Sequence, residues 1–166
     1  RQARKKVKRM YKQICAFLIL ATPVTADMPT ARDAFQAGQF TKAIAELRPA
    51  AQSGNAEAEF LLGNIHGLGL GVEADPVRGF EWHFRAAMKG HPAAQLRISR
   101  AFEAGNGVAQ DMFRAAVWAQ LATVGAADGA AQQSAQLHGQ LTAEMREAVD
   151  HIVQDYRLFL YPFSNP

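Results

Sequence analysis

Two glycine-rich stretches are the parts of this sequence that first suggest chemistry. Gly69-x-Gly71 and Gly105-x-Gly107 are each followed by Val, and glycine pairs of this kind can hold phosphate groups. A phosphate loop also needs Gly-Lys-Ser/Thr, and a dinucleotide site needs a preceding strand and a third glycine. Neither is present, because a helical pattern precedes each pair. The sequence therefore favours turns over nucleotide sites, and we expect no cofactor.

An aspartate stands three residues after the valine in both stretches, at Asp75 and Asp111. Two carboxylates can share acid–base work, but these two occupy equivalent positions in neighbouring units. They would lie about 10 Å apart, which is the spacing of packed helices. Asp is favoured at the cap of a helix, and Pro76 suits the first helical position. We therefore interpret both aspartates as helix caps.

The histidines and serines form no catalytic or metal-binding motif. No two histidines stand four apart as in a zinc-binding helix, and no serine lies in Gly-x-Ser-x-Gly or Ser-x-x-Lys. His66 lies near the end of a predicted helix, where we interpret it as a packing residue and keep ligand binding or pH sensing as the alternative. Cys15 is the only cysteine. It lies in a segment that we expect to be removed, which excludes disulfides and thiol catalysis in the mature chain.

A spacing of 36 residues relates these features to one another. The glycine pairs, the aspartates, and Trp82 with Trp118 all recur at this distance. In each unit, apolar residues at helical spacing precede the glycine turn, and the aspartate opens a second helix. Val72 and Val108 are expected to fill the space between the two helices. The units therefore predict helical hairpins that stack side by side as a solenoid.

The pattern Ala-x-Ala-Gln/Glu, Leu-Gly, Gly-x-Gly-Val-x-x-Asp and Trp-x-x-x-Ala-Ala resembles the Sel1-like repeat, a relative of the tetratricopeptide repeat. The resemblance covers 56–126 well and 31–55 more weakly, with His66 at a usually aromatic position and Gly79 in place of an alanine. It implies an all-α, right-handed α-solenoid that acts as a protein–protein interaction scaffold or adaptor with no chemistry of its own. The alternative is a hydrolase acting on cell-wall material or β-lactams, by analogy with cysteine-rich secreted relatives whose cysteines the mature chain lacks.

The N-terminal segment predicts export. Seven of the 18 lysines and arginines precede the apolar run Ile14–Val24, and Val24-Thr25-Ala26 has the small-x-small pattern of a cleavage site. These are the parts of a secretory signal peptide, so we expect a secreted or periplasmic protein cleaved after Ala26. An uncleaved anchor, with membrane contact, is the alternative. The predicted division is a signal peptide (1–26), a degenerate tetratricopeptide-like hairpin (27–55), two Sel1-like repeats (56–91 and 92–127) and C-terminal capping helices (128–166).

The distribution of charged residues beyond Ala26 predicts a protein partner. Beyond Ala26 the chain has 11 basic residues against 15 acidic ones, and such a mildly acidic body gives no reason to expect nucleic acid. Arg97 and Arg100 stand three apart on one predicted helical face, and Asn64 is equivalent to Arg100 in the preceding unit. We predict that these residues, with His66 as a further candidate, bind an unidentified protein through an acidic peptide or surface. Solvated surface charge is the alternative interpretation.

Overall fold

The computed structural model describes residues 28–160, and within this range it contains eight α-helices and no strand. The all-α expectation is therefore confirmed for the described residues, while the predicted signal peptide lies outside them. The helices are α2 (Met28–Gln36), α3 (Phe40–Gln52), α4 (Ala56–Leu68), α5 (Pro76–Met88), α6 (Pro92–Ala104), α7 (Met112–Val124), α8 (Ala130–His138) and α9 (Ala143–Leu160).

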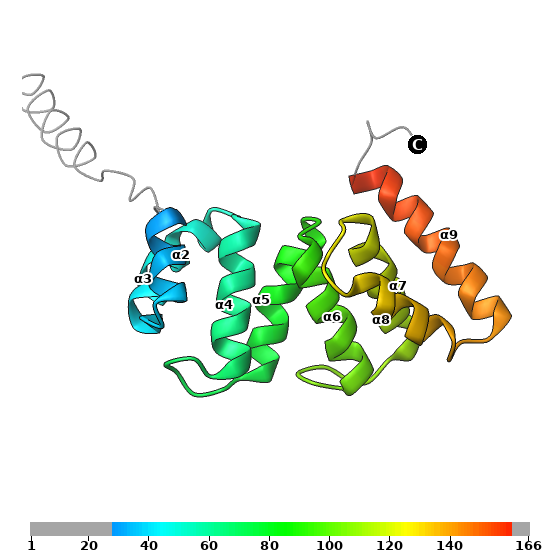
Figure 1. Ribbon diagram of the computed structural model, residues 1–166, viewed down its shortest axis with the longest axis horizontal. Coiled ribbons are helices and arrows are strands. Elements are labelled where there is room, and N and C mark those ends of the chain that lie inside the picture. Colours follow the sequence, from blue (N-terminus) through cyan, green and yellow to red (C-terminus); the bar gives the residue numbers. More distant parts are fainter. Residues whose placement is uncertain (1–27, 161–166) are drawn as a thin grey trace, which may run out of the picture.

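The helices follow one another along the long axis of the molecule, with α2 and α3 at one end and α9 at the other (Figure 1). Each helix from α2 to α7 packs against the next one in the chain, and α9 packs against α7. Small side chains let these helices approach closely, because the distance between helix axes depends on the residues at the contact. Five alanines of α5 and α7 have no exposed surface: Ala86, Ala87, Ala115, Ala116 and Ala122.

The two glycine stretches form equivalent turns at the same edge of the molecule (Figure 1). Gly69 and Gly105 end α4 and α6 with a φ of 70° in both cases. Only glycine adopts this left-handed conformation without strain, which explains why both units carry it. Gly71 and Gly107 also have positive φ values, of 68° and 74°. Both stretches are therefore turns between helices, as predicted.

The residues that follow each turn are also equivalent. The side chains of Asp75 and Asp111 accept hydrogen bonds of 2.9 Å from the backbone N–H groups of Arg78 and Arg114. Each is therefore the N-cap of the second helix of its unit, an interaction that contributes about 1 kcal/mol. Val72 and Val108 are half-buried and pack against the two hydrophobic clusters of the solenoid, Val72 near α3 and α4 and Val108 near α6 and α7.

Helix α4 is buried on almost all sides, whereas its sequence predicted a single apolar stripe. That stripe is buried as expected, through Ala58, Leu61, Leu62 and Ile65. The polar residues between them are buried as well, because α4 has α3 on one side and α5 on the other. Glu59 has no exposed surface, and Asn64 and His66 are each 8% exposed. Polar side chains in such positions need partners inside the protein.

Glu59 obtains its partners from the end of α5. Lys89 donates a hydrogen bond of 2.6 Å to Glu59 Oε2, and Arg85 Nε lies 3.1 Å from Glu59 Oε1. The position 36 residues later is Gln95, which is also buried and donates to the carbonyl oxygen of Ala87 at 3.3 Å. A buried polar side chain at this position therefore joins α4 to α5 in one unit and α6 to α5 in the next.

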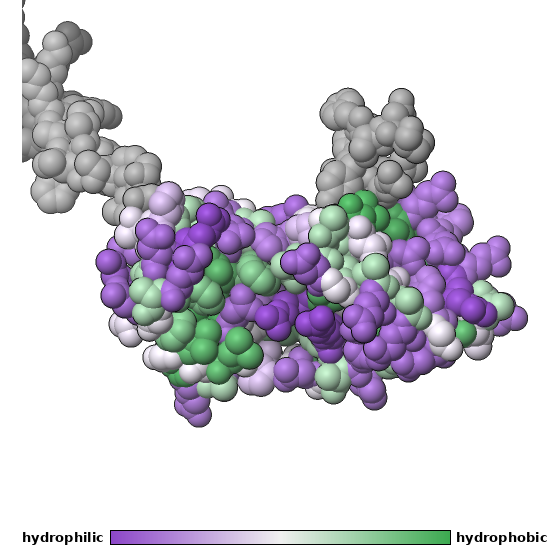
Figure 2. Space-filling model, viewed as in Figure 1, coloured by the Kyte–Doolittle hydropathy of each residue, from purple (hydrophilic) through white to green (hydrophobic). Residues whose placement is uncertain are grey.

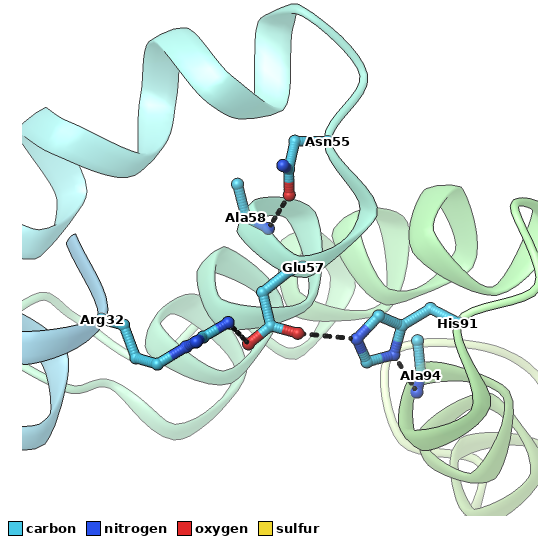
Figure 3. Close-up of polar contacts among 6 residues, drawn as sticks. All are labelled: Arg32, Asn55, Glu57, Ala58, His91 and Ala94. Atoms are coloured by element: carbon cyan, nitrogen blue, oxygen red, sulfur yellow. Dashed lines mark hydrogen bonds and ion pairs between the residues drawn. The ribbon is translucent and has the colours of Figure 1, made fainter. Parts of the chain in front are cut away.

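A second polar link runs along the solenoid through Glu57, at the start of α4. Figure 3 shows its carboxylate between Arg32 of α2, at 3.4 Å, and His91 at the start of α6, at 3.0 Å. His91 is also the N-cap of α6, since its Nδ1 accepts from the backbone N–H of Ala94 at 3.2 Å. Three successive helical hairpins are thus connected through one carboxylate, which favours a fixed arrangement between them.

Candidate functional site

A hollow between α4, α5 and α6, which we call the α4–α6 niche, has a volume of about 230 Å³. Hydrophilic side chains gather over α6 and α8 on the face drawn in Figure 2, and hydrophobic ones gather over α4 and the turn after it. The niche is lined by glycines and apolar residues, mostly of α4 and α5, and by polar and basic residues that include two arginines of α6. Its lining consists of Gly63, Asn64, Gly67, Leu68, Pro76, Gly79, Phe80, His83, Arg97, Arg100, Ala101, Ala104 and Asn106.

The basic side of the niche comes from Arg97 and Arg100 of α6. No carboxylate lines the niche, and among the described residues neither arginine lies within ion-pair distance of one. Burial lowers the pKa of Arg97, and the positive charge of Arg100 lowers it further. Two like charges thus stand beside each other without a counterion from the described part of the chain, and an anion between them would be stabilised by both.

His83 of α5 joins this basic side to α4. Its Nε2–H donates a hydrogen bond of 3.3 Å to Asn64 Oδ1. Burial, followed by the positive charge of Arg97, lowers the pKa of His83 to about 4. The imidazole is therefore neutral at pH 7. Because Asn64 Oδ1 accepts from His83, the amide N–H groups of Asn64 are left to donate to a ligand.

Sequence reasoning missed His83, and the reason lies in the facing helix. The ring occupies the space beside Gly63, where an added Cβ would overlap its atoms. In the next repeat the equivalent positions hold Ser99 and Ala119. A glycine facing a histidine has thus replaced a serine facing an alanine. The residue on the first helix is smaller and the residue on the second helix is larger than in the next repeat. A comparison of the two units would have found this change and drawn attention to His83.

Gly67 of α4 and Gly79 of α5, which we call the glycine floor of the niche, lie where the two helices approach each other closely. A Cβ added to Gly79 would lie 2.5 Å from the Cα of Gly67, so Gly79 has no room for a side chain, whereas a Cβ added to Gly67 would lie 3.6 Å from the Cα of Gly79, an ordinary contact. The replacement of the family alanine by Gly79 is therefore a requirement of packing in this unit. It leaves Phe80, half-buried, as the large apolar side chain next to the floor.

Two contacts between the units lie beside the niche. Phe60 stacks on His91, with ring centroids 4.7 Å apart, and also meets His83 of the lining at 5.6 Å. The turn at Gly107 rests on the carbonyl group of Pro76, the first residue of α5 and part of the lining, leaving no space for a Cβ. These contacts hold α4, α5 and α6 together around the niche.

Three of the four residues predicted to bind a partner lie together, and the fourth does not. Asn64, Arg97 and Arg100 line the niche, whereas His66 lines a separate hollow with Arg48 and Arg78. Burial is the main cause that lowers the pKa of His66, and the charge of Arg78 is the second. Among the described residues no group of three or more His, Cys, Asp or Glu side chains is arranged to hold a metal ion. The partner-binding role of all four residues stays a prediction.

The repeat units match a known family. The family model described as the Sel1 repeat matches residues 56–91 and 92–123. A curated relative, chitin synthase regulatory factor 3 of Schizosaccharomyces pombe, is 41% identical over 56 residues, which are 33% of this chain and 6% of that protein. The expected resemblance to Sel1-like repeats is thereby confirmed.

Two solved structures are similar to most of the arrangement of helices. One is a protective antigen present in uropathogenic Escherichia coli strains and displaying an SLR fold, with a TM-score of 0.76 and 26% identity over 84% of this chain and 31% of that one. Another is a Sel1 repeat protein from Oxalobacter formigenes, with a TM-score of 0.62 and 26% identity over 65% of this chain and 44% of that one. The chain spans less than half the length of each of these relatives.

Proposed function

Since residues 56–123 of the chain are two Sel1 repeats, we propose that the protein is an interaction scaffold and that its α4–α6 niche binds an acidic segment of a partner protein. Sel1 repeats are scaffolding units, and a rigid stack of hairpins presents a surface that needs little ordering on binding. The observation that carries the proposal is the pair Arg97 and Arg100, which line the niche without a carboxylate from residues 28–160 to pair with them. A partner carboxylate supplies the missing counterion.

A direct test uses a fluorescein-labelled peptide that alternates Glu with Leu and ends in Leu with a free carboxylate. A second peptide carries Lys in place of each Glu. We expect the acidic peptide to bind the full chain, as measured by fluorescence anisotropy, and the basic one to bind far more weakly. Binding is expected to weaken as salt is added, because the arginines act through charge.

Two variants locate the binding. The double substitution Arg97→Gln and Arg100→Gln should weaken binding of the acidic peptide by about tenfold or more, since charge-assisted hydrogen bonds are lost. Arg114→Gln is the matched control, because it removes an exposed arginine that pairs with Asp111 away from the niche. Equal affinity of wild type and the double variant would contradict the proposal.

We also propose that the scaffold works in a secreted or periplasmic compartment. The support is the basic and apolar N-terminal sequence ending at Ala26. Among residues 28–160, no helix has both the length and the apolar character that crossing a membrane requires. The intact mass of the protein recovered from an envelope fraction tests this: a chain that begins at Asp27 is expected, and a chain that retains the preceding segment would favour the anchor.

A further inference from the structure

The size of the niche limits what can enter it. Its volume of about 230 Å³ is below the range of about 300–1,000 Å³ that is usual for sites of drug-sized ligands and cofactors. A hollow of this size has no room for several residues of an extended peptide. The niche therefore accommodates about one residue of a partner chain.

The lining of the niche favours two kinds of group on that residue. Arg97, Arg100 and the free amide N–H groups of Asn64 offer donors to an anion. Apolar surface is offered by Leu68 of α4 and by Pro76 and Phe80 of α5, while Ala101 and Ala104 lie next to the arginines on α6. An Asp or Glu side chain would satisfy the donors and leave the apolar surface uncovered. A carboxyl-terminal residue carries a carboxylate and a side chain on the same carbon, and so reaches both.

We propose that the α4–α6 niche binds the carboxyl-terminal residue of a partner chain, with the α-carboxylate between Arg97 and Arg100 and an apolar side chain on the glycine floor beside Phe80. The inference rests on the proposed function and specifies which part of the partner is bound. The planar guanidinium groups suit a carboxylate because each can donate two parallel hydrogen bonds to it.

His83 acts as a positioning residue in this site. Its hydrogen bond to Asn64 Oδ1 fixes the orientation of the Asn64 amide, so that the N–H groups of the amide point away from the ring. The ring itself is held against Phe60, at 5.6 Å between centroids, and the absence of a side chain at Gly63 makes room for it. The donor that completes the carboxylate site is therefore set before the ligand arrives, which reduces the cost of binding.

Three small probes separate the possible ligands in an NMR titration of the full chain labelled with ¹⁵N. N-acetylleucine has the terminal carboxylate and the apolar side chain, N-acetylleucinamide lacks the carboxylate, and N-acetylglutamate α-amide has only a side-chain carboxylate. We expect saturable shifts of the amide signals of Asn64, Gly79 and Ala101 with N-acetylleucine. Each of the other two probes should bind more weakly by about tenfold or more, since each lacks one of the two interactions. Equal or tighter binding of either, or no saturable shift with N-acetylleucine, would overturn the inference.

Variants of the chain provide an independent readout. Arg100→Gln should weaken N-acetylleucine binding by about tenfold, and Arg114→Gln should leave it unchanged. Leu68→Gln removes apolar surface from the α4 part of the lining and should weaken N-acetylleucine more than N-acetylglutamate α-amide, with circular dichroism confirming that the variant is folded. If Arg100→Gln has no effect, or if Leu68→Gln weakens both probes alike, the assignment of the donors and of the apolar surface is wrong.

The acidic peptide distinguishes failure of this inference from failure of the proposed function. We expect amidation of its terminal Leu to weaken binding to the chain by about tenfold, although every Glu remains. If the amidated peptide binds as tightly as the free one and still depends on Arg97 and Arg100, the scaffold function stands and the terminal specificity is wrong. If neither peptide binds, both proposals fail.

Discussion

Protonation of His83 should destabilise the folded chain by an amount that follows from its surroundings. Burial is the main cause, and the charge of Arg97 the second, that lowers the pKa of His83 from 6.5 to about 4. Below pH 6.5 the imidazole of the unfolded chain takes up a proton while that of the folded chain remains neutral. Stability is therefore lost as the pH falls from 6.5 to about 4, and no further loss from this group follows below it. Each unit of difference corresponds to about 1.4 kcal/mol, so the total is about 3 kcal/mol.

The variant His83→Gln isolates this contribution, because glutamine does not titrate. The free energy of unfolding of both proteins would be measured by urea denaturation at pH 7 and pH 4, at constant ionic strength. We expect the advantage of wild type over the variant to shrink by about 3 kcal/mol between the two values of pH. Other groups, including His66, whose pKa is also lowered, contribute equally to both proteins and cancel in the difference. His151→Gln is a control that removes an exposed histidine of α9.

Two results would refute the reasoning. The first is an advantage of wild type that stays constant from pH 7 to pH 4. The second is an NMR titration in which the His83 imidazole takes up its proton near pH 6.5, since this would mean that the ring is neither buried nor influenced by Arg97. A terminal carboxylate bound beside Arg97 would add negative charge near the ring, so the titration should move to higher pH when N-acetylleucine is present.

Two further predictions concern the packing around the niche. Gly79→Ala should destabilise the chain by about 1 kcal/mol, because overpacking against Gly67 costs about 1–3 kcal/mol and exceeds the helix-propensity gain of about 1 kcal/mol; a higher urea midpoint for the variant would contradict this. The variant Glu59→Gln places in the first repeat the residue type that stands at Gln95 in the second. It should lower the free energy of unfolding by about 1 kcal/mol, a modest loss because Arg85 and Lys89 remain partly exposed to water and can be solvated there. The same urea experiment checks it, and an unchanged midpoint would show that the ion pairs contribute nothing.

The turns and caps of the solenoid could be predicted because their causes are local. A glycine that must adopt a positive φ and an aspartate that caps the N–H group three residues later need no information from distant parts of the chain. Gly69, Gly105, Asp75 and Asp111 take these roles in the structure as expected. The recurrence of such local signals at 36 residues also predicted the stacking of hairpins, since each hairpin must bury its apolar face against a neighbour.

The polar interior of the solenoid could not be predicted in the same way. Helical periodicity identified the apolar stripe of α4 but not the burial of Glu59, because that burial depends on α5 supplying Lys89 and Arg85 at the right place. Likewise Asn64 and His66 are separated by a single residue, yet they line different hollows. A rotation of about 200° around the helix axis separates such positions, and only the neighbouring helices decide what each one meets.

The sequence by itself thus determined the repeat, its turns and its caps, because each depends on residues within one helix end or one hairpin. The tertiary structure decided the site. Three contacts between helices and turns depend on side-chain volumes on both partners: the approach of α4 to α5 at Gly67 and Gly79, the insertion of His83 beside Gly63, and the contact of Gly107 with Pro76. These contacts form only when the hairpins pack against one another, so they cannot be read from the sequence. For this reason the arginines of α6 are recognised as a candidate site for a carboxyl-terminal residue only in the tertiary structure.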